Sequence, residues 1–189
     1  DIYYQGNIDK ELPVDLSVTY YLDGKAVSAD EIKGKSGKVK IRYDYKNKQY
    51  ETVNIDGKDE KIYIPFVMIT GLILDNDIFT NVNVTNGKLI NDGDHTIVAG
   101  FALPGMQENL NLDKEKLELP DYIEITADAK DFEMTNTVTI AANDMFNMVN
   151  TDNLDSVDEL DSAIKQLADA ITALCDGSDK LYGGLCTLL

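Results

Sequence analysis

The sequence has no tryptophan, one histidine and two cysteines among 189 residues, and these shortages argue against most enzyme chemistry. A hydrolase needs a nucleophile, a base and an orienting group, and His95 is the single imidazole available as a base. Zinc usually requires four nitrogen or sulfur ligands, which this composition does not supply. Acidic pairs are abundant, but a sugar-cleaving cleft is less expected without tryptophan. We therefore predict a non-enzymatic protein with no catalytic residue, metal ligand or cofactor.

Basic residues are also scarce, with 17 Lys and Arg against 34 Asp and Glu, which gives a formal net charge of −17. Such a chain repels a phosphate backbone or an anionic lipid surface over most of its area. The acidic residues are spread along the chain and 43% of residues are hydrophobic, which is typical of a solvated folded surface. We therefore do not expect this protein to bind nucleic acid.

No apolar run reaches the roughly 18 residues that a membrane-spanning helix needs. The nearest, IYIPFVMITGLIL from Ile62 to Leu74, is broken by Pro65 and Gly71 and predicts a buried strand. The chain begins at Asp1 without a signal segment and stops at Leu189 within a repeat. We expect it to be a fragment of a larger protein whose membrane segments lie elsewhere.

The two cysteines, Cys175 and Cys186, lie eleven positions apart near the end of the sequence. On a straight helix this spacing separates them by about 16 Å, more than the roughly 7 Å between Cα atoms that a disulfide allows. A chain reversal at Gly183 and Gly184, a bond to another chain, and two free thiols are alternatives that the sequence leaves open.

Residues 1–142 have the pattern of an antiparallel β domain. Short alternating runs rich in Val, Ile, Thr and Tyr are separated by Asp-Gly and Asn-Gly pairs, which are signals for two-residue hairpins. Examples are VDLSVTYYL before Asp23-Gly24 and NVNVTNGKLI, with its turn at Asn86-Gly87. Further strands are predicted in KVKIRYDYKN, HTIVAGFAL, YIEITADA and FEMTNTVTIAA. Because helical crossovers are almost absent, we predict an antiparallel β-sandwich.

Two local features within this β domain are predicted not to be strands. Ser28 and Glu31 have the spacing of a capping box, which predicts one helical turn that ends at Gly34 or Gly37. The segment GKSGK after it is predicted to be a turn, because it lacks the spacing of a phosphate-binding loop. As an alternative to one sandwich, the polar stretch QYETVNIDGKDE from Gln49 to Glu60 would divide two β lobes.

From Asn143 the apolar period changes to that of a helix, and residues 143–189 are predicted to form a helical heptad segment that opens a longer array. Leucine recurs every seventh position from Leu160 to Leu188, a small residue follows three positions later, and a Val, Ile or Leu precedes most of the leucines by three. This spacing gives one apolar stripe, which must be buried against another helix or the β domain. An ordinary amphipathic helix ending at Gly177 is the alternative. The predicted packing face consists of Val157, Leu160, Ala163, Ile164, Leu167, Ala170, Ile171, Leu174, Gly177, Leu181, Gly184 and Leu188.

The end of the chain, ITALCDG SDKLYGG LCTLL, resembles the X-X-X-Leu-X-X-Gly heptad arrays of surface membrane proteins of Gram-positive bacteria, including the phage-infection-protein family. The upstream stretch that holds Leu22-Asp23-Gly24 and Gly34-Lys35-Ser36-Gly37 is similar to a module that precedes such arrays. The first two heptads, VDELDSA and IKQLADA, carry Ala where the family has Gly. The resemblance implies an ectodomain anchored by a later transmembrane segment and assigns no catalytic residue.

The predicted function is therefore a non-catalytic, extracellular interaction or spacer module of a membrane-anchored bacterial surface protein. Its expected partner is a protein, or a second copy reached through a coiled coil of the heptad helix. The membrane is reached only through segments outside this sequence. One alternative is a calcium-dependent, carbohydrate- or protein-binding adhesin-like domain, for which DNDIFTN from Asp75 and NDGDH from Asn91 supply hard oxygen ligands. The other is a small secreted acidic hydrolase. The ligand, the binding face and the oligomeric state do not follow from the sequence.

Overall fold

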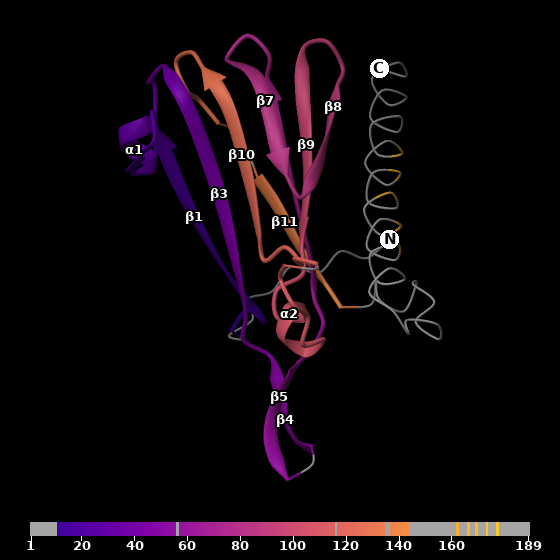
Figure 1. Cartoon of the computed structure of the whole chain (residues 1–189). Coiled ribbons are helices and arrows are strands. Elements are labelled where there is room, and N and C mark those ends of the chain that lie inside the picture. Colours follow the sequence, from indigo (N-terminus) through magenta and orange to yellow (C-terminus); the bar gives the residue numbers. More distant parts are fainter. Residues whose placement is uncertain are drawn as a thin grey trace, which may run out of the picture.

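The computed structural model describes residues 11–55, 57–115, 117–134 and 137–143, and five single residues farther along the chain. Eleven strands and two short helices lie in this part of the chain (Figure 1). The strands are β1 (Val14–Leu22), β2 (Lys25–Val27), β3 (Gly37–Asn47), β4 (Tyr50–Ile55), β5 (Lys58–Tyr63), β6 (Val67–Asp75), β7 (Phe79–Thr85), β8 (Gly87–Asn91), β9 (His95–Ala102), β10 (Tyr122–Ala129) and β11 (Thr137–Ala142). The helices are α1 (Ala29–Ile32) and α2 (Met106–Asn109).

The strands form two antiparallel sheets and a separate hairpin, which confirms a mainly β, antiparallel architecture. The five-stranded sheet has the order β2-β1-β3-β10-β7, and the four-stranded sheet has the order β11-β6-β9-β8. Among the described strands, β4 and β5 pair only with each other. In Figure 1 this hairpin lies at the bottom of the view and points away from the two sheets.

The local signals of the sequence account for several elements. β1 spans VDLSVTYYL, and it turns into β2 at Asp23-Gly24, where both residues have positive φ as this tight hairpin requires. The Ser28 hydroxyl accepts a hydrogen bond from the backbone N–H of Glu31, and the Glu31 carboxylate accepts one from the Ser28 N–H. This capping box forms α1, whose Ile32 is completely buried.

The predicted hairpin at Asn86-Gly87 is wrong, although strands lie on both sides of it. β7 pairs with β10 in one sheet, and β8 pairs with β9 in the other, so the chain changes sheets at this point. A Cβ built on Gly87 would lie 2.5 Å from the carbonyl oxygen of Ala99. The glycine is required by close approach to β9, not by a hairpin turn.

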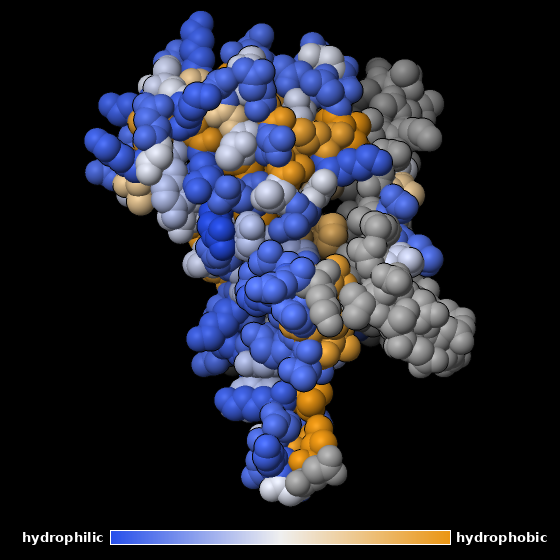
Figure 2. Space-filling model, viewed as in Figure 1, coloured by the Kyte–Doolittle hydropathy of each residue, from blue (hydrophilic) through white to orange (hydrophobic). Residues whose placement is uncertain are grey.

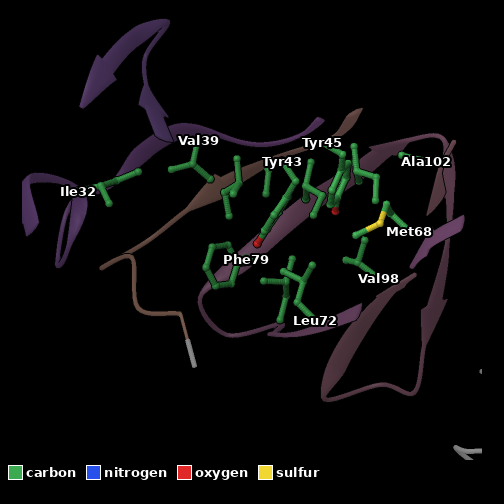
Figure 3. Packing of buried hydrophobic residues seen from close by; sticks show 14 of the residues in the cluster. Ile32, Val39, Tyr43, Tyr45, Met68, Leu72, Phe79, Val98 and Ala102 are labelled. Atoms are coloured by element: carbon green, nitrogen blue, oxygen red, sulfur yellow. The ribbon is translucent and has the colours of Figure 1, made fainter. Parts of the chain in front are cut away.

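One hydrophobic cluster draws side chains from both sheets (Figure 3). Tyr43 and Tyr45 point from β3 into it. The Tyr43 hydroxyl lies 3.2 Å from Thr137 Oγ1, and the Tyr45 hydroxyl is hydrogen-bonded to Thr70 Oγ1, which lies 2.8 Å from Thr139 Oγ1. Each phenol therefore has a polar partner in the opposite sheet, which offsets the cost of burying its hydroxyl.

These contacts set the orientation of β11. Thr137 and Thr139 face the two tyrosines, so Val138 and Ile140 lie on the opposite side of the strand, where they are 60% and 54% exposed. A hydrophobic alternation would have placed Val138 and Ile140 in the core. The register of β11 thus follows the hydrogen-bonding needs of the β3 tyrosines.

The polar stretch considered as a divide between two lobes forms most of the β4–β5 hairpin. The strands before and after it, β3 and β6, contribute to the same core cluster. In the apolar run that follows, β6 begins only at Val67 and has five buried residues, which are Val67, Met68, Thr70, Leu72 and Leu74. The predicted buried strand is confirmed there, and Ile62 and Tyr63 belong to β5.

The predicted helical segment lies almost entirely outside the described residues. Its five described positions are Ser162, Gln166, Asp169, Ala173 and Gly177, and each is helical and exposed. The other residues of the predicted packing face, and both cysteines, fall outside the described part of the chain.

Candidate interaction surfaces

The β4–β5 hairpin, called the arm from here on, has two chemically different faces. On one face Tyr50 and Tyr63 make an edge-to-face contact with 5.8 Å between ring centroids, and the Lys61 ammonium lies 4.4 Å from the Tyr50 centroid. On the other face Val53 and Ile55 are 41% and 47% exposed. Tyr50 is itself 44% exposed, and the register places Glu60 and Lys58 opposite Val53 and Ile55 on the second face. Both faces therefore leave apolar surface in solvent, and Figure 2 shows hydrophobic residues along one side of the arm.

Two asparagines hold the base of the arm. Asn109 of α2 donates to the Tyr63 carbonyl and accepts from the Tyr63 N–H, with both distances 2.7 Å. The buried Asn47 at the end of β3 donates to the Ile64 carbonyl at 2.7 Å and accepts from the Gln49 N–H at 2.9 Å. An isolated two-stranded hairpin is marginally stable in water, so these bonds at its base help to maintain it.

Gly105 adds a steric constraint at the same place. A Cβ built on it would lie 2.8 Å from Cγ of Tyr63, and its φ is +87°. The ring of Tyr63 therefore rests on the backbone at the start of α2. Beside it is a pocket of about 220 Å³ whose lining includes Lys46, Lys114, Glu108 and Asp121. Charges of both signs line this pocket, and it has no concentrated field of either sign.

The outer face of the five-stranded sheet is polar, and its charged groups pair with one another. Arg42 Nε lies 2.8 Å from Asp44 Oδ1, and Lys40 Nζ lies 3.2 Å from Glu124 Oε2. The Arg42 guanidinium also lies 3.8 Å from the centroid of the Tyr122 ring. Lys40 and Arg42 therefore already have anionic and aromatic partners within the domain.

The outer face of the four-stranded sheet is apolar. Its side chains alternate with the core residues on β6, β9 and β11. Ile73, Val138 and Ile140 are more than half exposed, and Ile69 and Ile97 are half-buried. The register places Ile140 opposite Ile69, and Ile73 opposite Ile97, so the four isoleucines belong to adjacent strands. These five residues are called the outer face below.

His95 and the acidic loops take part in turns. The Asp92 carboxylate accepts from the N–H groups of Asp94 and His95 at 3.1 and 2.7 Å, and His95 Nδ1 lies 3.8 Å from it. The two loops that suggested calcium lie together, because Asn76 donates to the carbonyls of Asp94 and Gly93 at 2.9 Å. Within the described ranges, no group of three or more His, Cys, Asp or Glu residues is arranged to hold a metal ion.

The sequence interpretation missed the arm and the outer face. The arm had a usable signal, because an Asp-Gly pair at positions 56 and 57 separates the alternating stretches YETVNI and KDEKIY. The outer face had no such signal, because the hydrophobic alternation of β11 by itself favours Val138 and Ile140 in the core. Of the predicted helical packing face, only Gly177 is described, and it is exposed.

Comparison of the chain with protein-family models, curated proteins and solved structures gives no match. None of the helices in the described part of the chain is long and apolar enough to cross a membrane.

Proposed function

We propose that this chain is a non-catalytic interaction and spacer module of the extracellular part of a membrane-anchored bacterial surface protein. In this proposal the two sheets form a β-sandwich body that presents the arm to a protein partner. The heptad segment continues as a helix and connects the body to the cell envelope. The resemblance to X-X-X-Leu-X-X-Gly arrays supports this location.

The observation that carries the interaction role is the construction of the arm. Its base is held by Asn47 and Asn109, yet Val53 and Ile55 on one face have nearly half of their surface in solvent. Exposed aliphatic side chains on a hairpin with little core of its own are a cost to solubility. A protein partner with a complementary apolar groove would bury them, and the fixed base would reduce the ordering cost of binding.

The location is tested with the full-length gene product in the cells that produce it. A membrane-impermeant amine reagent applied to intact cells should label the exposed lysines of the arm, and the protein should sediment with the envelope. A cytosolic protein that is labelled only after lysis would contradict the location.

The interaction role has a separate test in the same cells. A photo-crosslinking residue at Val53 of the full-length protein should give a discrete adduct with one surface protein. The adduct should disappear when Ile55→Asp is added, while a probe at the exposed Thr126 of β10 gives none. Equal crosslinking from both positions, or no adduct at Val53, would contradict a specific role for the arm.

A further inference from the structure

β11 turns its aliphatic residues away from the core, and this reversal places an apolar surface on the outside of the molecule. Val138 and Ile140 are 60% and 54% exposed on the outer face, beside Ile73 at 54%. A strand with one solvated face normally points polar residues outward. Because β11 is apolar outward and hydroxylated inward, the four-stranded sheet has the pattern of a sheet that is covered on both faces.

We propose that the outer face is the docking site of this chain's own heptad segment, Val157 to Gly177. The segment would lie across β11, β6 and β9 with its Leu and Ile side chains against the sheet. The body would then have three layers, formed by the two sheets and a helix.

The position of the segment in the chain favours this occupant over a separate protein. β11 is an edge strand of the same sheet, and it ends at Ala142. Residues 143–156 can span up to about 46 Å when extended, which is enough to bring Val157 to either end of the sheet. The effective concentration of a segment tethered so closely is far higher than that of a free partner.

The dimensions of helix and sheet also agree. A helix over residues 157–177 is about 31 Å long, and strands of eight or nine residues such as β9 and β6 are about 27–30 Å long. Four strands are about 14 Å across, and a helix with its side chains is about 10–12 Å wide. One helix therefore suffices to cover the face.

The five described residues of the segment are compatible with this orientation. Ser162, Gln166, Asp169, Ala173 and Gly177 are helical and exposed, and they follow one another at separations of four, three, four and four residues. At about 100° per residue, such positions fall on one stripe about 80° wide. On the same helix the leucines and isoleucines of the heptads fall on the opposite side, which is the side that would face the sheet.

The centre of the outer face can receive a helix closely. Gly71 of β6 pairs with Ala99 of β9, so two small residues lie side by side between the isoleucines. A Cβ built on Gly71 would meet nothing nearer than the Val98 carbonyl oxygen at 3.9 Å. Gly71 is half-buried and Ala99 is 4% exposed. A Cβ at Gly71 would fit the sheet, and a longer side chain there would project outward and obstruct a docked helix.

The first experiment detects the contact in the full 189-residue chain under reducing conditions. Methyl NOEs should connect leucines of the heptad segment with isoleucines of the outer face. A mixture of leucine-labelled and isoleucine-labelled chains then distinguishes the source, because only contacts between copies give NOEs in the mixture. Intrachain NOEs support the proposal, whereas NOEs of comparable strength in the mixture, or none in either sample, overturn it.

The second experiment tests the site by substitution. Backbone amides of residues 160–174 should exchange slowly with solvent in the unmodified chain and at least tenfold faster in Gly71→Lys. Amides of β10 should remain unchanged in both, which shows that the core is intact. Thr126→Lys, on the outward side of the other sheet, is the matched control and should leave residues 160–174 protected. Equal protection in Gly71→Lys and Thr126→Lys, or no protection in the unmodified chain, would show that the segment does not dock here. Neither experiment depends on the cellular location of the protein.

Discussion

Gly100 of β9 lies directly against Ile123 of β10, at a place where the two sheets approach each other closely. A Cβ built on Gly100 would be 2.6 Å from Cγ2 of Ile123 and 2.9 Å from its Cδ1. Ile123 is completely buried. Gly100 is also buried, and it pairs with Gly87 of the neighbouring strand β8. The glycine therefore allows a full-sized isoleucine to fill the space between the sheets.

We expect Gly100→Ala to destabilise the protein by about 1–3 kcal/mol, because the added methyl group must displace Ile123 in a packed core. Chemical denaturation measures the change. Gly71→Ala is the control on the adjacent strand β6, where the new methyl group meets nothing closer than 3.9 Å. If both alanine variants were equally stable, the close packing at Gly100 would be contradicted.

The Tyr43 hydroxyl should make stability depend on pH in the alkaline range. Burial raises its pKa to about 12, above the value near 10 of an unfolded tyrosine. The unfolded chain loses this proton first, so the contribution is complete below about pH 10 and is lost as the pH rises toward 12. Between about pH 8 and pH 11 the unmodified protein should lose about 1.4 kcal/mol more stability than Tyr43→Phe. Denaturation curves at both pH values check this, and parallel losses in the two proteins would refute it.

The capping box of α1 can be tested through Glu31. Hydrogen bonds from the backbone and hydroxyl of Ser28 lower the pKa of the Glu31 carboxyl. Ser28→Ala removes the hydroxyl donor, so this pKa should move upward toward its ordinary value in an NMR titration. The lost cap should also cost about 1 kcal/mol of stability. Asp30→Ala, in the same turn but outside the capping box, should leave the Glu31 pKa in place.

Asn109→Ala should loosen the arm without unfolding the body. The variant loses both hydrogen bonds to the Tyr63 backbone, and no other strand of the described ranges pairs with β4 or β5. Trypsin should then cleave at Lys58 and Lys61 several-fold faster, while amide exchange in β3 and β10 stays unchanged. Glu108→Ala changes the preceding, exposed residue of α2 and serves as the control. Identical cleavage rates in the two variants would mean that Asn109 does not hold the arm.

The sequence by itself determined the local elements, because their causes lie within a few residues. Asp23-Gly24 supplies the positive φ angles of a tight hairpin, and Ser28 with Glu31 supplies a cap for α1. The antiparallel β class also follows from short alternating strands without crossover helices. The heptad pattern is equally local, and its helix and packing face remain predictions.

Only the tertiary structure decided which strands pair and which side of a strand faces the core. Asn86-Gly87 has the composition of a hairpin turn, yet the chain changes sheets there, and β7 pairs with β10 while β8 pairs with β9. The orientation of β11 depends on Tyr43 and Tyr45, which lie more than ninety residues earlier and need hydroxyl partners inside the core. A period of two fits both orientations of a strand, so the choice was made by burial and hydrogen bonding across the sheets.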